Sequence, residues 1–138
     1  WSVTSYKQLY DEAVEMDRKR RADPGKQTKN HIESCVGKEP GVFVAATDYV
    51  KALPLTVSKW FPGKFAALGT DGFGLSEDRE NLREHFEVSA RHIAWCALRE
   101  LYASGKIPEK TLNKARKELS IQQDTKEEKG CEPINTTS

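Results

Sequence analysis

The sequence predicts an α/β domain, and two observations favour that class. Two short and nearly all-apolar runs, residues 41–46 and 65–68, have the pattern of strands that are buried on both faces, as in parallel sheets. Segments with helical spacing of apolar residues precede, separate and follow these runs. Strands and helices that alternate in this way are typical of a small, mostly parallel sheet flanked by helices.

Length and charge limit the possible functions. The chain has 138 residues, which suits one domain rather than two. Its 22 Lys and Arg against 21 Asp and Glu give a net charge of +1, which argues against a globally cationic nucleic-acid binder. No apolar run approaches the ~20 residues that a membrane helix needs. We therefore expect neither nucleic acid nor a membrane among the partners.

The chain begins at Trp1, and its only methionine is Met16. Residues 1–4 are rich in aromatic and β-branched side chains, which predicts a strand or the last part of one. Three short strands make a small sheet for a three-layer domain. We therefore expect the sequence to begin within a domain whose further strands lie upstream.

A helix is expected after Ser5, which is a good N-cap and forms a capping box with Gln8. This helix ends in four cations, residues 18–21, which interact favourably with the helix dipole. A nucleic-acid patch is the alternative, but no aromatic residues are interleaved with the cations. A polar loop and a short helix over residues 31–36, stopped by Gly37, are expected next.

The residues after the first apolar run predict a helix capped by Thr47. Its apolar face would carry Tyr49, Val50 and Leu53, and Pro54 either kinks it or begins a second helix. Pro62 and Gly63 then turn the chain into the second run.

The segment 69–76 is rich in glycine, follows a strand and opens a helix. Such a place binds anions, because free N–H groups and the positive helix end point outward. However, the segment matches neither the dinucleotide nor the Walker motif, and Glu77 and Asp78 would repel a phosphate. We interpret it as a tight turn that ends in Ser76 as an N-cap, with Glu77 and Asp78 in the first helical turn.

Two more helices are predicted in the last third of the chain. The longest periodic stretch begins at Ser89 and is stopped by Gly105, and Pro108 suits the first turn of a final helix. The polar residues 120–138 predict a disordered tail.

The cysteines and histidines are candidates for disulfides, a zinc site or a nucleophile pair. Cys35, Cys96 and Cys131 are odd in number and lack a C-x-x-C pair, which favours reduced thiols over a disulfide framework. His92 and Cys96 share a helix face, as do His31 and Cys35, but a zinc site needs further ligands. A Cys–His nucleophile pair lacks an orienting third group. His85 belongs with His92 and Cys96 to the metal candidates, and the residues alone do not indicate an enzyme.

Several blocks in order resemble the C-terminal domain of the homodimeric pyruvate dehydrogenase (acetyl-transferring) family. These blocks are residues 1–5 (WSVTS), 45–49 (AATDY), 68–76 (LGTDGFGLS) and 79–88 (RENLREHFEV). The resemblance covers residues 1–119 and implies a transketolase-like C-terminal domain with three layers, truncated at its N-terminus. Residues 120–138 have no counterpart in the family.

The resemblance implies an activity for the whole enzyme: oxidative decarboxylation of pyruvate, with transfer of the acetyl group to a lipoyl group of a partner acyltransferase. It implies a homodimer that uses thiamine diphosphate and magnesium. It also implies a cytoplasmic location in bacteria, or a mitochondrial or plastid matrix in eukaryotes. A transketolase or a 2-oxoglutarate dehydrogenase is the alternative enzyme, and a stand-alone, non-catalytic binding or assembly module is the alternative of another class.

No catalytic, cofactor-binding or metal-binding residue can be carried over from the family. Its G-D-G motif, its activating glutamate and its active-site histidines lie upstream of this region, so we expect this segment to be inactive alone and to bind no cofactor. The resemblance implies a structural and interdomain role for a set of nine residues. They are Thr47, Asp48, Gly69, Thr70, Asp71, Gly72, Phe73, Gly74 and Ser76.

The sequence departs from the family at several positions. Leu75 stands where the family has Arg, and Ser89 stands where Asp is usual. Trp95 and Cys96 replace small aliphatic residues, and residues 22–34 fit the family poorly.

Overall fold

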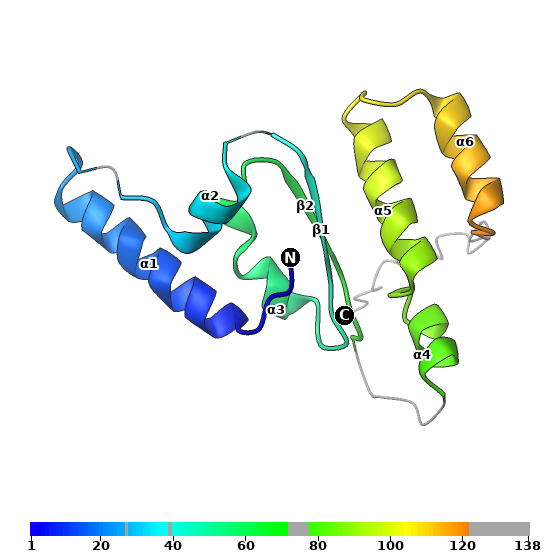
Figure 1. Cartoon of the computed structure of the whole chain (residues 1–138), viewed down its shortest axis with the longest axis horizontal. Coiled ribbons are helices and arrows are strands. Elements are labelled where there is room, and N and C mark those ends of the chain that lie inside the picture. Colours follow the sequence, from blue (N-terminus) through cyan, green and yellow to red (C-terminus); the bar gives the residue numbers. More distant parts are fainter. Residues whose placement is uncertain (27, 39, 72–77, 122–138) are drawn as a thin grey trace, which may run out of the picture.

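The computed structural model describes residues 1–26, 28–38, 40–71 and 78–121 (Figure 1). Its helices are α1 (Tyr6–Ala22), α2 (His31–Val36), α3 (Ala52–Leu55), the 3-10 helix η1 (Ser58–Trp60), α4 (Arg79–His85), α5 (Ala90–Ala103) and α6 (Glu109–Glu118), and its strands are β1 (Val42–Ala46) and β2 (Lys64–Leu68). The order of these elements confirms the α/β class.

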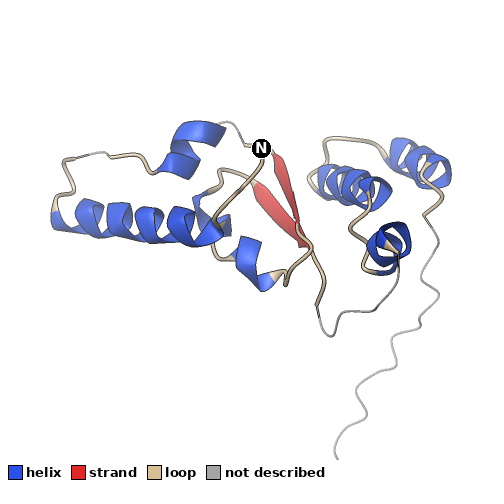
Figure 2. Ribbon diagram, turned by 60° about the horizontal axis from the view of Figure 1, so that its bottom comes forward, coloured by secondary structure: helices blue, strands red, loops and turns tan. Residues whose placement is uncertain are grey.

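The two strands form a parallel sheet in the middle of the molecule. Val42 pairs with Lys64 at one end of the sheet, and Ala46 pairs with Leu68 at the other. Figures 1 and 2 show α1, α2 and α3 on one side of the strands, and α5 and α6 on the other. Helix α5 contacts both strands, and α3 contacts β2. This arrangement confirms a small parallel sheet flanked by helices.

The strands are less buried than the apolar runs predict. Residues 42–45 of β1 and 65–68 of β2 are half-buried, whereas Ala46 and Lys64 are exposed. In the described part of the chain each strand has a neighbouring strand on one edge only. A two-stranded sheet cannot enclose its strands as the middle of a wide parallel sheet does.

The core lies between α1, α2 and η1. It consists of Ala13, Ile32, Val57 and Trp60, with Tyr6, Leu9, Val36 and Phe61 packed against it. The Phe61 ring links this core to the sheet, because its centroid lies 5.0 Å from that of Phe43 and 4.8 Å from that of Phe65. Aromatic contacts between the helical layer and both strands therefore hold the two layers together.

The Ser5 N-cap of α1 and the Gly37 stop of α2 are confirmed. The Ser5 hydroxyl accepts a hydrogen bond from the Gln8 N–H, at 3.3 Å. Asn30 and Glu33 form a capping box at the start of α2. Gly37 follows α2 with φ +70°, a conformation that side chains other than glycine rarely adopt.

Residues 1–4 do not form a strand, which corrects the sequence-based expectation. Residues 1–3 and strand β1 line the same cavity of about 920 Å³ instead of pairing with each other. The Trp1 side chain is 64% exposed and its ring lies 6.1 Å from that of His31. Aromatic and β-branched composition alone does not make a strand, because a strand also needs a hydrogen-bonded neighbour.

The expected helix after Thr47 is also wrong. Helix α3 begins only at Ala52, and the Thr47 hydroxyl accepts a hydrogen bond from the Tyr49 N–H (3.1 Å) within a loop. Pro54 lies inside this four-residue helix and is buried, and η1 follows separately. Such short-range side-chain hydrogen bonds compete with helix formation.

Helix α4 is capped by Asp78 and not by Ser76. The Asp78 carboxylate accepts hydrogen bonds from the N–H groups of Glu80 (3.0 Å) and Asn81 (2.9 Å). Asp78 was expected in the first turn of this helix, but it is the N-cap residue that precedes that turn. Ser76 itself lies outside the described residues. Both residue types are good N-caps, so composition did not decide between them.

The last two helices agree with the sequence. Helix α5 follows Ser89 and is succeeded by Gly105, whose φ is +69°, and Pro108 immediately precedes α6. The Arg91 guanidinium joins both neighbours of α5, since it pairs with Glu84 on α4 and donates to the Ser120 carbonyl oxygen (3.1 Å) after α6. The predicted disordered tail lies outside the described residues except for residues 120 and 121.

Candidate functional site

Five of the nine residues expected at an interdomain site lie together at one end of the sheet. Thr47 and Asp48 follow β1, whereas Gly69, Thr70 and Asp71 follow β2. Because the strands are parallel, both segments leave the sheet at the same edge. In open α/β sheets, ligands bind outside the carboxyl ends of the strands. We call the segments 47–51 and 69–71 the β-end clamp.

Backbone and hydroxyl hydrogen bonds join the two segments of the β-end clamp. The Thr47 N–H donates to the Leu68 carbonyl oxygen (3.0 Å), which extends the strand ladder by one bond. Thr70 donates twice to the other segment: its N–H to the Tyr49 carbonyl oxygen (2.9 Å) and its hydroxyl to the Asp48 carbonyl oxygen (2.7 Å). The position of one loop is therefore fixed by the other.

Asp71 closes the β-end clamp by binding Lys51. One carboxylate oxygen accepts the Lys51 N–H (3.0 Å), and the other lies 3.2 Å from the Lys51 ammonium group. These hydrogen bonds, the backbone one first, hold the pKa of Asp71 below its usual value. Since the Asp71 side chain is 55% exposed, solvent screens the pair, and its main effect is to orient the loop.

Gly69 is buried at the point where the two segments touch. A Cβ atom on it would lie 2.5 Å from the Tyr49 carbonyl oxygen and 3.0 Å from the Thr47 methyl carbon. No side chain fits at the first of these distances without a backbone shift. The glycine is therefore required by close backbone approach.

The remaining residues of the expected site are Gly72, Phe73, Gly74 and Ser76, and they lie outside the described residues, as does Leu75. The geometry of the β-end clamp thus covers the first half of the glycine-rich turn. Whether the second half contacts another domain stays a prediction.

Exposed apolar side chains lie in the β-end clamp and on α3, the helix that follows its first segment. Tyr49 is 63% exposed, Val50 37% and, on α3, Leu55 45%. Large apolar side chains are common on surfaces singly, but three within seven residues are typical of a contact surface. The sequence placed Tyr49 and Val50 on a helix face, and the structure places them in the loop of the β-end clamp instead.

The described residues do not fit thiamine diphosphate and magnesium. In residues 1–26, 28–38, 40–71 and 78–121 no group of three or more His, Cys, Asp and Glu side chains is placed to hold a metal ion. The carboxylate of Asp71, the acid fixed within the β-end clamp, is already bound by Lys51. We therefore derive no reaction step through the cofactor in this region.

The histidine and cysteine candidates make local packing and hydrogen-bond contacts. Cys35 Sγ lies 3.4 Å from His31 Nε2 on α2, as their spacing predicts. His92 Nδ1 bonds the Ser89 hydroxyl (2.8 Å), and Cys96 is buried, 8% exposed. Burial raises the pKa of the Cys96 thiol, which opposes a role as a nucleophile. The His85 ring packs edge-on against Phe86.

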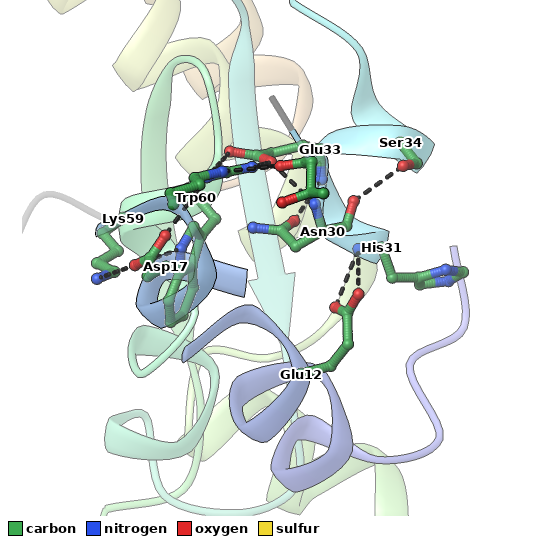
Figure 3. A network of polar contacts seen from close by, with 10 residues as sticks. Glu12, Asp17, Asn30, His31, Glu33, Ser34, Lys59 and Trp60 are labelled. Carbon is green, nitrogen blue, oxygen red and sulfur yellow. Dashed lines mark hydrogen bonds and ion pairs between the residues drawn. The ribbon is translucent and has the colours of Figure 1, made fainter. Parts of the chain in front are cut away.

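Sequence reasoning missed a polar network between α1, α2 and η1 (Figure 3). Arg20 was expected to act on the helix dipole, but its guanidinium pairs with Glu33 and donates to the Thr28 carbonyl oxygen (Nε, 2.8 Å). Asp17 accepts hydrogen bonds from the Trp60 indole N–H (3.2 Å) and the Lys59 ammonium (2.7 Å). The Arg20–Glu33 and Asp17–Trp60 pairs lie 13 and 43 positions apart in the sequence, so no local pattern points to them.

A second part of the network joins α1 to the start of α2. The Glu12 carboxylate accepts the His31 N–H through both oxygens, at 3.1 and 3.0 Å. Figure 3 shows Glu12 reaching up from its helix to the first turn of α2. An acid at a helix N-terminus satisfies free N–H groups and interacts favourably with the dipole.

Comparison with known proteins decides the family. The model of the transketolase-like TK C-terminal domain matches residues 1–89, which include both strands and the β-end clamp. The chain belongs to this family. The resemblance read from the ordered sequence blocks is thereby confirmed.

The similar curated proteins are pyruvate dehydrogenase E1 components, which are enzymes. The chain is 34% identical over 133 residues to that of Pseudomonas aeruginosa, covering 95% of this chain and 15% of the relative. It is 36% identical over 126 residues to that of Escherichia coli K12, covering 90% and 14%. For Mycolicibacterium smegmatis the identity is 31% over 122 residues, covering 88% and 13%. The chain thus spans about one seventh of the length of these relatives.

Among the described residues, no helix has both the length and the apolar character needed to cross a bilayer.

Proposed function

We propose that this chain is the C-terminal part of a pyruvate dehydrogenase E1 component. The whole enzyme would decarboxylate pyruvate with thiamine diphosphate and magnesium, and pass the acetyl group to a lipoyl group of a partner acyltransferase. The observation that carries the proposal is the 34% identity to an E1 component over 95% of the chain.

Within that enzyme we assign a structural and assembly role to this segment. The β-end clamp fixes two loops at the carboxyl edge of the sheet, where the exposed Tyr49, Val50 and Leu55 can contact a neighbouring domain or the second subunit of a homodimer. A rigid loop pair with exposed apolar side chains is suited to such contact, because little conformational entropy is lost on association.

Catalysis is assigned to residues outside this chain. Asp71 and Asp48 are the carboxylates of the β-end clamp, and Asp71 is bound by Lys51. The cofactor itself supplies the electron sink in thiamine chemistry, so a segment remote from it need only pack and position.

A chimera tests this assignment. The chain replaces the matching 126-residue stretch of the Escherichia coli E1 component, and acetyl transfer from pyruvate to the lipoyl acyltransferase is measured. We expect an active dimer by light scattering, and an inactive or monomeric chimera when Gly69→Ala is added. Gly25→Ala, a glycine whose Cβ would meet only ordinary contact at 3.5 Å, is the matched control.

The isolated chain tests whether the segment has catalytic activity of its own. We expect no calorimetric binding of thiamine diphosphate and no decarboxylation of pyruvate by the 138 residues alone. Activity of the isolated chain would overturn the division of labour. A well-folded isolated monomer together with a chimera that folds but has no activity would instead favour a stand-alone, non-catalytic module of the same fold.

A further inference from the structure

A second cavity lies at the other end of the sheet from the β-end clamp. It has a volume of about 720 Å³ and is lined by the end of α1, the loop before α2, the end of α2 and the turn after η1. Lys38 precedes β1 and Pro62 precedes β2, so this cavity lies near the amino ends of the strands. We call it the basic pocket.

The lining of the basic pocket is strongly cationic. Its charged residues are Arg20, Lys26, Lys29, Lys38 and Lys59, against the single acid Glu33. Arg20 is paired with Glu33, and Lys59 is paired with Asp17, which does not line the cavity. Lys26, Lys29 and Lys38 form no ion pair with any described residue, and all three are exposed. Three lysines without an ion pair among the described residues therefore line one cavity.

The floor of the basic pocket is apolar. Trp60, Phe61, Pro24 and Pro62 line it, and Trp60 is 7% exposed. Thr28 also lines the cavity, and its hydroxyl oxygen is buried without a hydrogen-bond partner among the described residues. A buried hydroxyl usually has a partner, so a ligand oxygen would satisfy this one if the Thr28 side chain turned toward the cavity.

The polar network holds the wall of the basic pocket in place. Arg20 is fixed by Glu33 and by the Thr28 carbonyl oxygen, and Trp60 is fixed by its indole hydrogen bond to Asp17 (Figure 3). A wall whose side chains are already ordered loses little conformational entropy when a ligand binds.

We propose that the basic pocket binds a small organic phosphate. A phosphate group offers several acceptor oxygens and about two negative charges, which suits three lysines and a hydroxyl donor. The apolar part of the molecule would lie on Trp60, Phe61 and the prolines. The volume falls within the ~300–1,000 Å³ of small-molecule sites. This site is independent of the proposed E1 function, because it lies away from the β-end clamp.

Titration calorimetry on the 138-residue chain tests the proposal with four probes: inorganic phosphate, ribose 5-phosphate, ADP and a hexaglutamate peptide. We expect saturable one-site binding of ribose 5-phosphate or ADP, tighter than that of inorganic phosphate or hexaglutamate. The indole N–H signal of Trp60 in ¹H–¹⁵N spectra should move, whereas that of Trp95 on α5 should stay. These shifts identify the site independently of the heat signal.

A charge-matched pair of variants decides where the probe binds. Lys29→Gln with Lys38→Gln should weaken binding by about tenfold, since two phosphate contacts are lost. Lys110→Gln with Lys114→Gln on α6 removes the same charge elsewhere and should change binding by less than about twofold. All four lysines are exposed, so both variants should keep the wild-type melting temperature.

Several outcomes would overturn the proposal. No saturable binding by a folded chain, or equal weakening by both double variants, would remove the site. Inorganic phosphate as tight as the organic phosphates would reduce it to an anion site. Hexaglutamate binding more tightly than either organic phosphate would make the pocket a docking place for an acidic peptide.

Discussion

Gly69 and Tyr49 approach so closely that a Cβ atom at position 69 would lie 2.5 Å from the Tyr49 carbonyl oxygen. Gly69→Ala must therefore push the two loops of the β-end clamp apart. We expect the free energy of unfolding to fall by about 1–3 kcal/mol, the usual cost of overpacking a closely packed site. Chemical denaturation followed by circular dichroism measures it.

The matched substitution is Gly25→Ala, where the new methyl group would lie 3.5 Å from an Asp23 carboxylate oxygen. At that ordinary contact distance stability should change by less than about 0.5 kcal/mol. If Gly69→Ala unfolded at the same denaturant concentration as the wild type, the close approach would not constrain the loops.

Thr70→Val tests the hydroxyl bond across the β-end clamp. The change keeps a β-branched side chain of similar shape but removes the hydrogen bond from the Thr70 hydroxyl to the Asp48 carbonyl oxygen (2.7 Å). We expect a loss of about 0.5–1.5 kcal/mol in the free energy of unfolding, the net worth of one such bond. Thr111→Val, at an exposed position of α6, should cost less than about 0.5 kcal/mol. Equal effects of both substitutions would show that the hydroxyl bond contributes nothing.

Elements with local signals were predictable from the sequence. Helix α2 carries its own start and stop, since Asn30 and Glu33 form the capping box and Gly37 adopts φ +70°. The two apolar runs became β1 and β2, because continuous apolar residues between turn signals have few other stable arrangements. Five of the nine residues of the candidate site follow the two parallel strands, and their interdomain role stays a prediction.

The errors concern positions where residue type alone allows more than one local structure. Residues 1–4 have strand composition, but in the described chain no strand pairs with them. Thr47 is a good N-cap by type, yet its hydroxyl bonds the loop N–H of Tyr49, in a segment fixed by Thr70 from the other strand end. Arg20 lies in a basic run, and its partner Glu33 is 13 positions away. Composition and periodicity cannot choose among such alternatives.

Cys96 should be the slowest described thiol to react. Its side chain is 8% exposed, and burial raises the pKa of the thiol, so little of the reactive thiolate forms at neutral pH. Cys35 is exposed on α2. We expect iodoacetamide to modify Cys35 at least about tenfold faster than Cys96, measured by mass spectrometry of the peptides. In denaturant the two rates should become similar, and a persistent difference there would assign it to local sequence instead of burial.

Acid should weaken the fold partly through Glu33. Hydrogen bonding to Arg20 is the largest cause that holds the pKa of Glu33 below its usual value, and hydrogen bonding to Lys59 does the same for Asp17. A carboxylate with a lowered folded pKa stabilises the fold above its unfolded pKa, about 4.3 for Glu, and this contribution is lost as the pH falls through the folded pKa. Stability should therefore decline below about pH 4.3.

Glu33→Gln isolates this effect. Glutamine can keep the reciprocal bond of the capping box to the Asn30 N–H while it removes the charge that pairs with Arg20. The variant should be less stable than the wild type at pH 6, and the gap should narrow as the pH approaches 3. Glu118→Gln removes an exposed carboxylate that pairs with Lys114 at 3.8 Å, and it should shift stability little at any pH. A gap that stayed constant from pH 6 to about pH 3 would mean that the charge of Glu33 does not act through Arg20.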